Sequence, residues 1–323
     1  MFQRAAISPP AFIVPRMPTS HAVEITRPEN VPTTPADFDP PLRSCRLCGA
    51  TDIQRFDVDY RGVQISKCGA CGVKFMNPQY TDRYLERVYA RYNDPAQDQL
   101  MTIPVGRGAV MPNKREGNFN LIERFVSPGR FLSIGSGSGD ELRTAMSRGW
   151  SVEGYDVDPV TTERLARELG VPVYSGDLTT VALPTAAYDC VYMDQVLEHP
   201  KEPAPYLQLS HRVLKPTGVL YIGVPNIESL AASWKTFLGK RNLKPLRGRH
   251  YDSWHHLFYY APRTLRGILD RQFDFDVLRM EGDPFPKLHQ GFGSRMADAL
   301  RRRFPVLDSS LRVVARPRAR GSV

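Results

Sequence analysis

The feature that most constrains the fold is a regular alternation of short apolar runs with turns and helical segments between residues 129 and 228. The run RFLSIG at 130–135 precedes a helical segment at 140–148, and SVEGYDVDP at 151–159 precedes the helical TTERLARELG. Three further apolar runs follow, PVYSGDL at 172–178, YDCVYMDQVLEH at 188–199 and GVLYIGVPN at 218–226. Buried strands that alternate with helices are typical of a parallel sheet covered by helices on both faces. We therefore predict an α/β chain with a doubly wound, mostly parallel sheet, which the late apolar run at 311–317 helps to complete.

Length and composition limit the class of protein. A chain of 323 residues favours one large domain with a small companion. With 41% hydrophobic and 24% charged residues it has a globular composition, and no run reaches the ~18 apolar residues that a membrane-spanning helix needs. The net charge of +9 is compatible with nucleic acid, an anionic membrane surface or an anionic small acceptor.

Changes in composition and hydrophobic periodicity along the chain predict its domains. The first part is rich in proline and lacks hydrophobic periodicity, which favours a disordered tail. Paired cysteines follow, and then two helical segments. We predict a disordered tail at 1–41, a zinc ribbon at 42–80, a helical cap and linker at 81–128, and a large domain at 129–323 with a substrate-side insertion at 229–262.

A glycine-rich turn is the first candidate site. Gly135, Gly137 and Gly139 follow an apolar run and open a helix. Such glycines permit a tight turn and let the backbone approach a ligand at the helix N-terminus. Taken alone, the pattern also fits a plain strand-to-helix turn made of small residues.

Two acids lie at regular distances beyond that turn. Asp156 ends the next apolar run, about twenty residues on, where a carboxylate can accept hydrogen bonds from both hydroxyls of a ribose. Asp177 lies in the turn after the third run, where it could meet the amine of an adenine. The alternative for Asp177 is a solvated turn acid.

These motifs, in this order and spacing, resemble those of class I S-adenosylmethionine-dependent methyltransferases over residues 129–228. The resemblance implies a Rossmann-like fold with a seven-stranded sheet and S-adenosylmethionine as cofactor. It implies that the glycine turn holds the methionine part, that the segment after the second strand holds the ribose, that the third turn faces adenine, and that the end of the fourth strand lies beside the sulfonium. The residues concerned are, in that order, Gly135, Ser136, Gly137 and Gly139; Asp156 and Val157; Asp177 and Leu178; Asp194 and Gln195. The chain departs from the family at Ser133, where an acid is usual, so a contact to the amino group of the cofactor is weakened or supplied elsewhere.

Four cysteines form two matched knuckles. Cys45 and Cys48 make one C-x2-C pair, and Cys68 and Cys71 make the second after nineteen intervening residues. Four thiolates can hold one Zn²⁺ in a closed structural site. Two disulfides or a redox pair are the alternatives; the prolines near residue 10 break any apolar signal core, which favours a reducing, cytoplasmic location over disulfides. The fifth, Cys190, fits a small core residue.

The cysteine segment and the helical stretch after it also resemble the N-terminal zinc-binding segment of some sugar, lipid-intermediate and natural-product methyltransferases. There a helix caps the cofactor cleft. The resemblance places Tyr89 and Tyr92 on or near such a cap, and plain packing is the alternative for both.

Histidine is a suitable base for an acceptor proton because its pKa lies near neutrality. His199 ends the fourth apolar run, at the sheet edge where open α/β folds bind ligands, and His256 precedes an aromatic-rich turn. We name both as candidate catalytic residues; a structural role is the alternative for each. Some quinone-pathway O-methyltransferases carry an E-x-x-E-H metal pattern, but the equivalent run here is Gln195, Glu198 and His199, and the missing first acid argues against a catalytic divalent ion.

A basic segment between Lys235 and Arg249 has six Lys or Arg and no acid. It is compatible with an anionic acceptor, with an anionic membrane surface, or with a solvated face. No nucleic-acid-binding motif accompanies it, so nucleic acid is disfavoured as a partner. We expect methyl transfer to a hydroxyl of a small or carrier-linked sugar, lipid or natural-product intermediate. An RNA-modifying methyltransferase that uses the zinc ribbon is the alternative, and a nicotinamide-dependent oxidoreductase is a third class.

Overall fold

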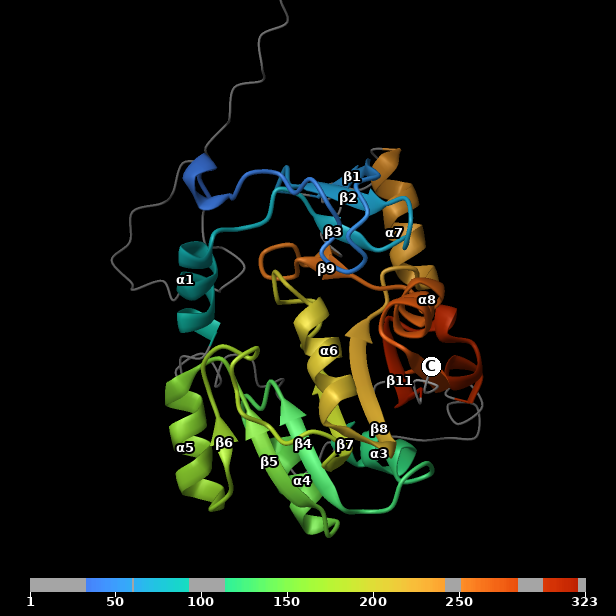
Figure 1. Ribbon diagram of the computed structural model, residues 1–323. Coiled ribbons are helices and arrows are strands. Elements are labelled where there is room, and N and C mark those ends of the chain that lie inside the picture. Colours follow the sequence, from blue (N-terminus) through green and yellow to red (C-terminus); the bar gives the residue numbers. More distant parts are fainter. Residues whose placement is uncertain (1–32, 60, 93–113, 242–250, 284–298, 319–323) are drawn as a thin grey trace, which may run out of the picture.

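The computed structural model describes residues 33–59, 61–92, 114–241, 251–283 and 299–318, and these form two sheets with helices around them (Figure 1). Within these ranges the larger sheet has seven strands in the order β10, β11, β8, β7, β4, β5, β6. Neighbours from β8 to β6 run parallel, whereas β11 lies antiparallel to β8 and β10. The strands are β4 (Arg130–Ile134), β5 (Ser151–Tyr155), β6 (Val173–Tyr174), β7 (Tyr188–Asp194), β8 (Leu214–Pro225), β10 (Phe275–Gly282) and β11 (Ser310–Pro317). The predicted seven-stranded, mostly parallel sheet is confirmed.

Helices connect the parallel strands, as the alternating pattern predicts. The chain runs from β4 through α4 to β5, through α5 to β6, and from β7 through α6 to β8. The strand β8 is buried without interruption from Gly218 to Val224, because elements cover both faces of the sheet there. The helices that surround this sheet are α3 (Lys114–Ile122), α4 (Asp140–Ser147), α5 (Pro159–Leu169), α6 (Ala204–Val213) and α8 (Pro262–Gln272).

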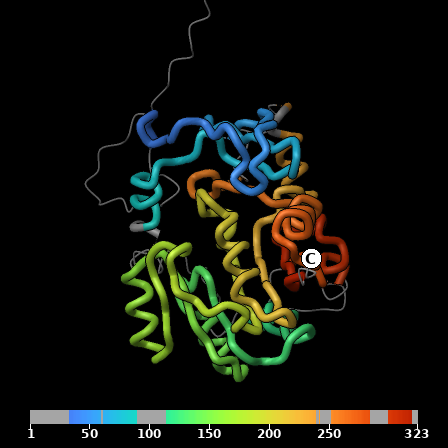
Figure 2. The backbone as a smooth tube through the Cα atoms, viewed as in Figure 1, coloured from blue at the N-terminus to red at the C-terminus, as the bar shows by residue number. Residues whose placement is uncertain are grey.

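The cysteine segment forms the second sheet, with strands in the order β1, β2, β3, β9. Its first three strands are β1 (Ile53–Val58), β2 (Gln64–Cys68) and β3 (Lys74–Met76). The fourth strand, β9 (Phe258–Tyr259), comes from the far part of the chain and pairs Phe258 with Phe75. Figure 2 shows this orange segment returning to the blue N-terminal region above the larger sheet.

One hydrophobic cluster joins the two sheets, and it includes Val73 and Phe75 of the cysteine sheet together with Leu132 and Val191 of the larger sheet. The cysteine segment is therefore packed into the same core as the large domain. The prediction of a self-contained ribbon at 42–80 needs correction in one respect, because residues 258–259 of the predicted insertion complete its sheet.

Residues 33–41 are ordered, which corrects the prediction of a disordered tail extending to residue 41. A short 3-10 helix (Pro35–Asp37) begins this segment, and the side chain of Asp37 is buried and bonded to Arg87. The ring of Phe38 lies 5.0 Å from that of Tyr80. Aromatic packing therefore fixes the segment in spite of its prolines. The rest of the predicted tail, 1–32, lies outside the described residues.

The predicted cap and linker, 81–128, contains two helices with different neighbours. Helix α1 (Asp82–Tyr92) follows the cysteine sheet, and Tyr84 on it stacks on Tyr80 at 4.0 Å. Helix α3 belongs to the larger sheet, where Phe119 stacks on Tyr192 at 6.0 Å. The intervening residues 93–113 lie outside the described ranges.

The predicted insertion at 229–262 contains α7 (Leu230–Lys240) and β9. Much of its basic segment, 242–250, lies outside the described residues. Among the described helices, none has the length and apolar character needed to span a bilayer.

Candidate functional site

The glycine-rich turn lies between β4 and α4, and its three glycines have positive φ values of 79°, 43° and 77° at Gly135, Gly137 and Gly139. A Cβ on Gly135 would come within 2.6 Å of Val196, and one on Gly139 within 2.4 Å of Leu165. Packing alone therefore explains these two glycines. A Cβ on Gly137 would meet no described atom within 4 Å, so the turn leaves open space on this side.

Asp156 directly follows β5 and faces the glycine turn. One of its carboxylate oxygens accepts the Gly137 N–H at 2.8 Å, and the other accepts the Asp158 N–H at 3.1 Å. The next residue, Val157, is 62% exposed, which leaves an apolar side chain available beside this carboxylate. Ser136 is buried in the turn itself. The structure thus brings together residues that the sequence pattern singled out at two separate positions.

Asp177 and Leu178 follow β6 and differ in exposure. Leu178 is buried in the core, whereas Asp177 is exposed. The backbone N–H and the hydroxyl of Thr179 both donate to one oxygen of Asp177 at 2.8 Å, and these bonds lower the pKa of Asp177. Its carboxylate is therefore held in place by its own turn.

A buried carboxyl group lies beside Ser133, the position at which the methyltransferases that this chain resembles usually have an acid. The hydroxyl of Ser133 donates to Glu141 Oε1 at 2.9 Å, and Arg115 lies 3.9 Å from the other oxygen. Burial raises the pKa of Glu141 to about 7, against the opposing effects of Ser133 and Arg115. The acid missing from the strand is thus present on the neighbouring helix.

Asp194 ends β7 and lies among charged side chains. Lys114 Nζ is 3.4 Å from Asp194 and 3.1 Å from Asp283. Burial lowers the pKa of Lys114, but the two carboxylates outweigh this effect and raise it. Gln195 follows with a positive φ of 58°, and its N–H donates to the Gly223 carbonyl at 2.8 Å. The lysine partly neutralises Asp194 at the carboxyl end of the strand.

Three histidines gather where the segment after β7 meets the segment before β9. The ring centroid of His199 lies 4.9 Å from that of His255 and 4.9 Å from that of His256, and the centroids of His255 and His256 are 4.0 Å apart. Burial lowers the pKa of His199 to about 4 and those of His255 and His256 well below the usual value. Glu198 Oε1 lies 4.0 Å from His199 Nε2. The two predicted catalytic histidines are therefore neighbours, with His255 as a third member.

The four cysteines form a compact cluster. The Sγ atoms of Cys45 and Cys71 are 3.7 Å apart, those of Cys48 and Cys68 are 3.6 Å apart, and all four lie within 4.8 Å of one another. Tetrahedral coordination with Zn–S bonds of ~2.3 Å places sulfur atoms ~3.8 Å apart, so the spacing fits a metal. All five cysteines are free, which does not match the disulfide alternative.

The two knuckles have the same backbone design. Gly49 N–H donates to the Cys45 carbonyl at 2.8 Å, and Gly72 N–H donates to the Cys68 carbonyl at 3.0 Å. Both glycines have positive φ, 74° and 79°, which the turn after each cysteine pair requires. Cys190 is buried in β7 as a core residue, as the sequence predicts.

A family comparison decides the class of the large domain. The family model described as a methyltransferase domain matches residues 113–279. The chain belongs to this methyltransferase family. The match spans β4 to β8, and therefore includes the glycine turn, Asp156 and the end of β7 within the methyltransferase domain.

Two curated relatives match parts of the chain. An uncharacterized 37.1 kDa protein in transposon Tn4556 of Streptomyces fradiae is 34% identical over 110 residues, 32% of this chain and 32% of the relative. A probable S-adenosylmethionine-dependent methyltransferase of Mycolicibacterium smegmatis is 36% identical over 93 residues, 28% of this chain and 35% of the relative. The chain thus spans about a third of the length of each.

Among solved structures, the methyltransferase domain is similar in fold to 1,6-didemethyltoxoflavin-N1-methyltransferase of Burkholderia thailandensis, with bound 1,6-didemethyltoxoflavin and S-adenosylhomocysteine. The two chains are 15% identical, and the match covers 82% of this chain and 99% of the other with a TM-score of 0.50. This likeness supports a Rossmann-like methyltransferase fold.

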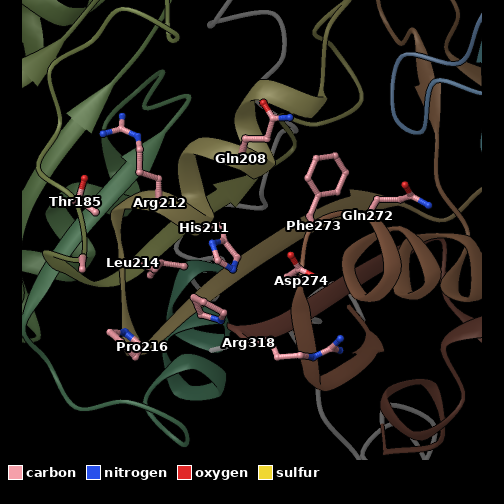
Figure 3. Close-up of a pocket in the computed structure, with 12 residues that line it drawn as sticks. Thr185, Gln208, His211, Arg212, Leu214, Pro216, Gln272, Phe273, Asp274 and Arg318 are labelled. Carbon is pink, nitrogen blue, oxygen red and sulfur yellow. The ribbon is translucent and has the colours of Figure 1, made fainter. Parts of the chain in front are cut away.

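A hollow of about 550 Å³ lies at the amino ends of β7 and β8, on the side of the larger sheet opposite to the glycine turn (Figure 3). Its lining includes Thr185, Arg212, Leu214 and Phe273. Open α/β folds bind ligands at the carboxyl ends of their strands. This hollow is therefore separate from the glycine turn and the histidines of the methyltransferase domain.

Sequence reasoning missed side chains whose partners are distant along the chain. It did not single out Glu141 or Lys114, and of the two adjacent histidines at 255 and 256 it named only His256. Local motifs gave no signal for these contacts, although the two acids directly after the glycine turn, Asp140 and Glu141, could have indicated a carboxyl group near Ser133.

Proposed function

We propose that this methyltransferase domain transfers a methyl group from S-adenosylmethionine to a hydroxyl of a small or carrier-linked acceptor, such as a sugar, lipid-linked or natural-product intermediate. The observation that carries the proposal is the Asp156 carboxylate bonded to the open glycine turn at Gly137, in a chain of the methyltransferase family. Bound S-adenosylmethionine supplies an electrophilic methyl group on a sulfonium. The protein's task is then to align donor and acceptor and to manage the acceptor's proton.

The cofactor side of the proposal rests on the carboxyl edge of the sheet. The Gly135–Gly139 turn receives the methionine part, Asp156 binds the ribose hydroxyls, and the exposed Val157 contacts the adenine ring. Asp177 and the backbone of Leu178 would face the other side of the adenine, since the Leu178 side chain lies in the core. Glu141 supplies the carboxylate for the cofactor's amino group that Ser133 does not provide, because the two side chains are hydrogen-bonded.

The acceptor side lies beyond β7. We assign Asp194 and Gln195 to the neighbourhood of the sulfonium, and His199 and His256 to the acceptor's proton. The placement of the histidines, on the same segment as Asp194 and on the segment that meets it, supports this assignment. The described part of the basic segment consists of Lys235 and Lys240 on α7 and of Arg241 directly after it, and its charge suits an anionic acceptor group.

The cysteine cluster is proposed to hold one structural Zn²⁺ through Cys45, Cys48, Cys68 and Cys71. Four thiolates leave no open coordination position, so the ion would stabilise the fold and take no part in methyl transfer. The sulfur spacing and the matched knuckles support this assignment. Metal analysis of the protein should return zinc bound to thiolates.

Calorimetric titration with S-adenosylhomocysteine tests the cofactor site. The wild-type chain should bind it, and Asp156→Ala should weaken binding on the order of 100-fold, because two charge-assisted hydrogen bonds of about 1.5 kcal/mol each are lost. Glu163→Ala is the matched control, since Glu163 is an exposed acid on the neighbouring helix α5. Unchanged affinity in Asp156→Ala would overturn the site assignment.

A further inference from the structure

The three imidazoles of His199, His255 and His256 have the arrangement of a ligand set. One ring nitrogen from each lies within 4.8 Å of the corresponding nitrogens of the other two. Metal–nitrogen bonds of ~2.0–2.1 Å in a tetrahedral site place nitrogen atoms ~3.4 Å apart. The three nitrogens are therefore at most about 1.4 Å further apart than a tetrahedral ion requires.

Backbone hydrogen bonds fix the two segments that carry the histidines. The carbonyl of Glu198 accepts the Leu257 N–H at 2.8 Å and the Phe258 N–H at 3.1 Å. His199 Nδ1 also lies 3.4 Å from the carbonyl of His255. The imidazoles are thus brought together by the backbone on both sides, which is the preorganisation that a metal site needs.

Glu198 supplies the second, independent observation. Its side chain is 1% exposed, and within the described residues neither carboxylate oxygen has a hydrogen-bond partner. A buried carboxylate without a partner is strongly unfavourable, and native structures pair such groups or bind a cation with them. One of its oxygens lies 4.0 Å from His199 Nε2, so the carboxylate borders the histidine cluster.

We propose that His199, His255 and His256 bind one divalent transition-metal ion, and that the buried carboxylate of Glu198 beside them balances its charge. Three imidazoles beside a carboxylate suit Zn²⁺, Co²⁺, Ni²⁺ or Fe²⁺ and leave a fourth position open, whereas Mg²⁺ and Ca²⁺ prefer oxygen ligands. The distant pair at 255–256 could not be linked to His199 by sequence spacing.

The site has a chemical use that rests on the proposed function. A divalent ion at the acceptor side would bind the acceptor's oxygen and lower the pKa of its hydroxyl group. In the metal-bound chain the histidines would act as ligands of the ion in place of bases, because a coordinated imidazole has no lone pair left for a proton, and the proton of the acceptor's hydroxyl group would pass to water. Metal binding itself does not depend on methyl transfer and can be tested without an acceptor.

Cobalt titration of the full-length, zinc-loaded protein tests the site. We expect one added Co²⁺ per chain, with the visible d–d bands of a tetrahedral ion bound to nitrogen and oxygen and no thiolate-to-cobalt charge-transfer band, because the cysteines keep their zinc. His255→Ala/His256→Ala and Glu198→Gln should each weaken this binding at least ~10-fold. His211→Ala is the matched control, because His211 lies on α6 and outside the cluster.

Binding of S-adenosylhomocysteine, measured on the same samples, separates the two proposals and shows that each variant is folded. A chain that binds S-adenosylhomocysteine but takes up no added Co²⁺, or takes it up equally in all variants, overturns the histidine site alone. A chain that takes up Co²⁺ at the histidines but does not bind S-adenosylhomocysteine overturns the proposed function alone. Appearance of the charge-transfer band would mean exchange at the cysteines and would also count against the histidine site.

Discussion

The buried carboxyl group of Glu141 makes stability depend on pH. Its pKa is raised by burial from 4.5 to about 7 in the folded chain, so the folded state keeps a proton that the unfolded state releases. Stability from this group is therefore present below about pH 4.5 and is lost as pH rises to about 7. Glutamine does not titrate, so Glu141→Gln should not lose this stability. The free energy of unfolding of the variant minus that of wild type should therefore rise by at most about 3 kcal/mol between pH 4.5 and 7.

Urea denaturation of the cofactor-free protein at pH 5, 6, 7 and 8 measures this difference. Glu163→Gln, at an exposed acid of α5, is the control and should show no such trend. A constant difference between Glu141→Gln and wild type at all four values would contradict the raised pKa.

Gly137 and Gly149 allow a matched pair of substitutions. Both have positive φ, 43° and 86°, and a Cβ on either would meet no described atom within 4 Å. Alanine should cost about 1 kcal/mol of stability at each position because of the backbone conformation. Only Gly137→Ala should also weaken the binding of S-adenosylhomocysteine in calorimetry, because only Gly137 lies in the turn beside Asp156. Equal affinities in the two variants would argue against a ligand at this turn.

Among individual residues, those that belong to a local motif could be predicted from the sequence. The glycine turn, Asp156 and the paired cysteines have fixed spacings along the chain, and the structure brings each set together. Glu198 was noticed only as part of an incomplete motif, because its relation to His255 depends on two segments 57 residues apart meeting in space.

At the scale of elements, β9 links the cysteine sheet to the histidines. It pairs with β3 through Phe75 and Phe258, and it directly follows the segment that carries His255 and His256. Removing the metal from the cysteines should loosen β3 and therefore β9. Hydrogen exchange of the amides at 257–260 should accelerate after chelation under reducing conditions, while the amides that pair β10 with β11 stay protected. Unchanged exchange at 257–260 would show that β9 is held independently of the metal.

The strand β10 shows why some elements escaped prediction. Its sequence FDVLRMEG contains three charged residues, which weaken the apolar pattern of a strand. One of them, Glu281, is 3% exposed and pairs with the buried Arg312 of β11. Such a buried pair resembles two surface residues in the sequence, since each charge is neutralised only by its tertiary partner.

At the scale of the whole molecule, the shared hydrophobic cluster predicts cooperative unfolding. The cluster contains residues of both sheets, so neither sheet keeps its core when the other unfolds. Differential scanning calorimetry should give one transition for the zinc-loaded chain, and chelation should lower the temperature of that whole transition. A separate low-temperature transition that alone responds to chelation would show that the cysteine sheet is an independent unit.

The pairing of β3 with β9 also sets an order for biosynthesis. The cysteines at 45–71 leave the ribosome long before residues 258–259, so the knuckles can capture an ion while their sheet still lacks its fourth strand. The final sheet forms only after most of the larger sheet has been synthesised. Newly made chains would therefore pass through a stage in which the exposed edge of β3 awaits its partner, and a chaperone or a second nascent chain could meet that edge first.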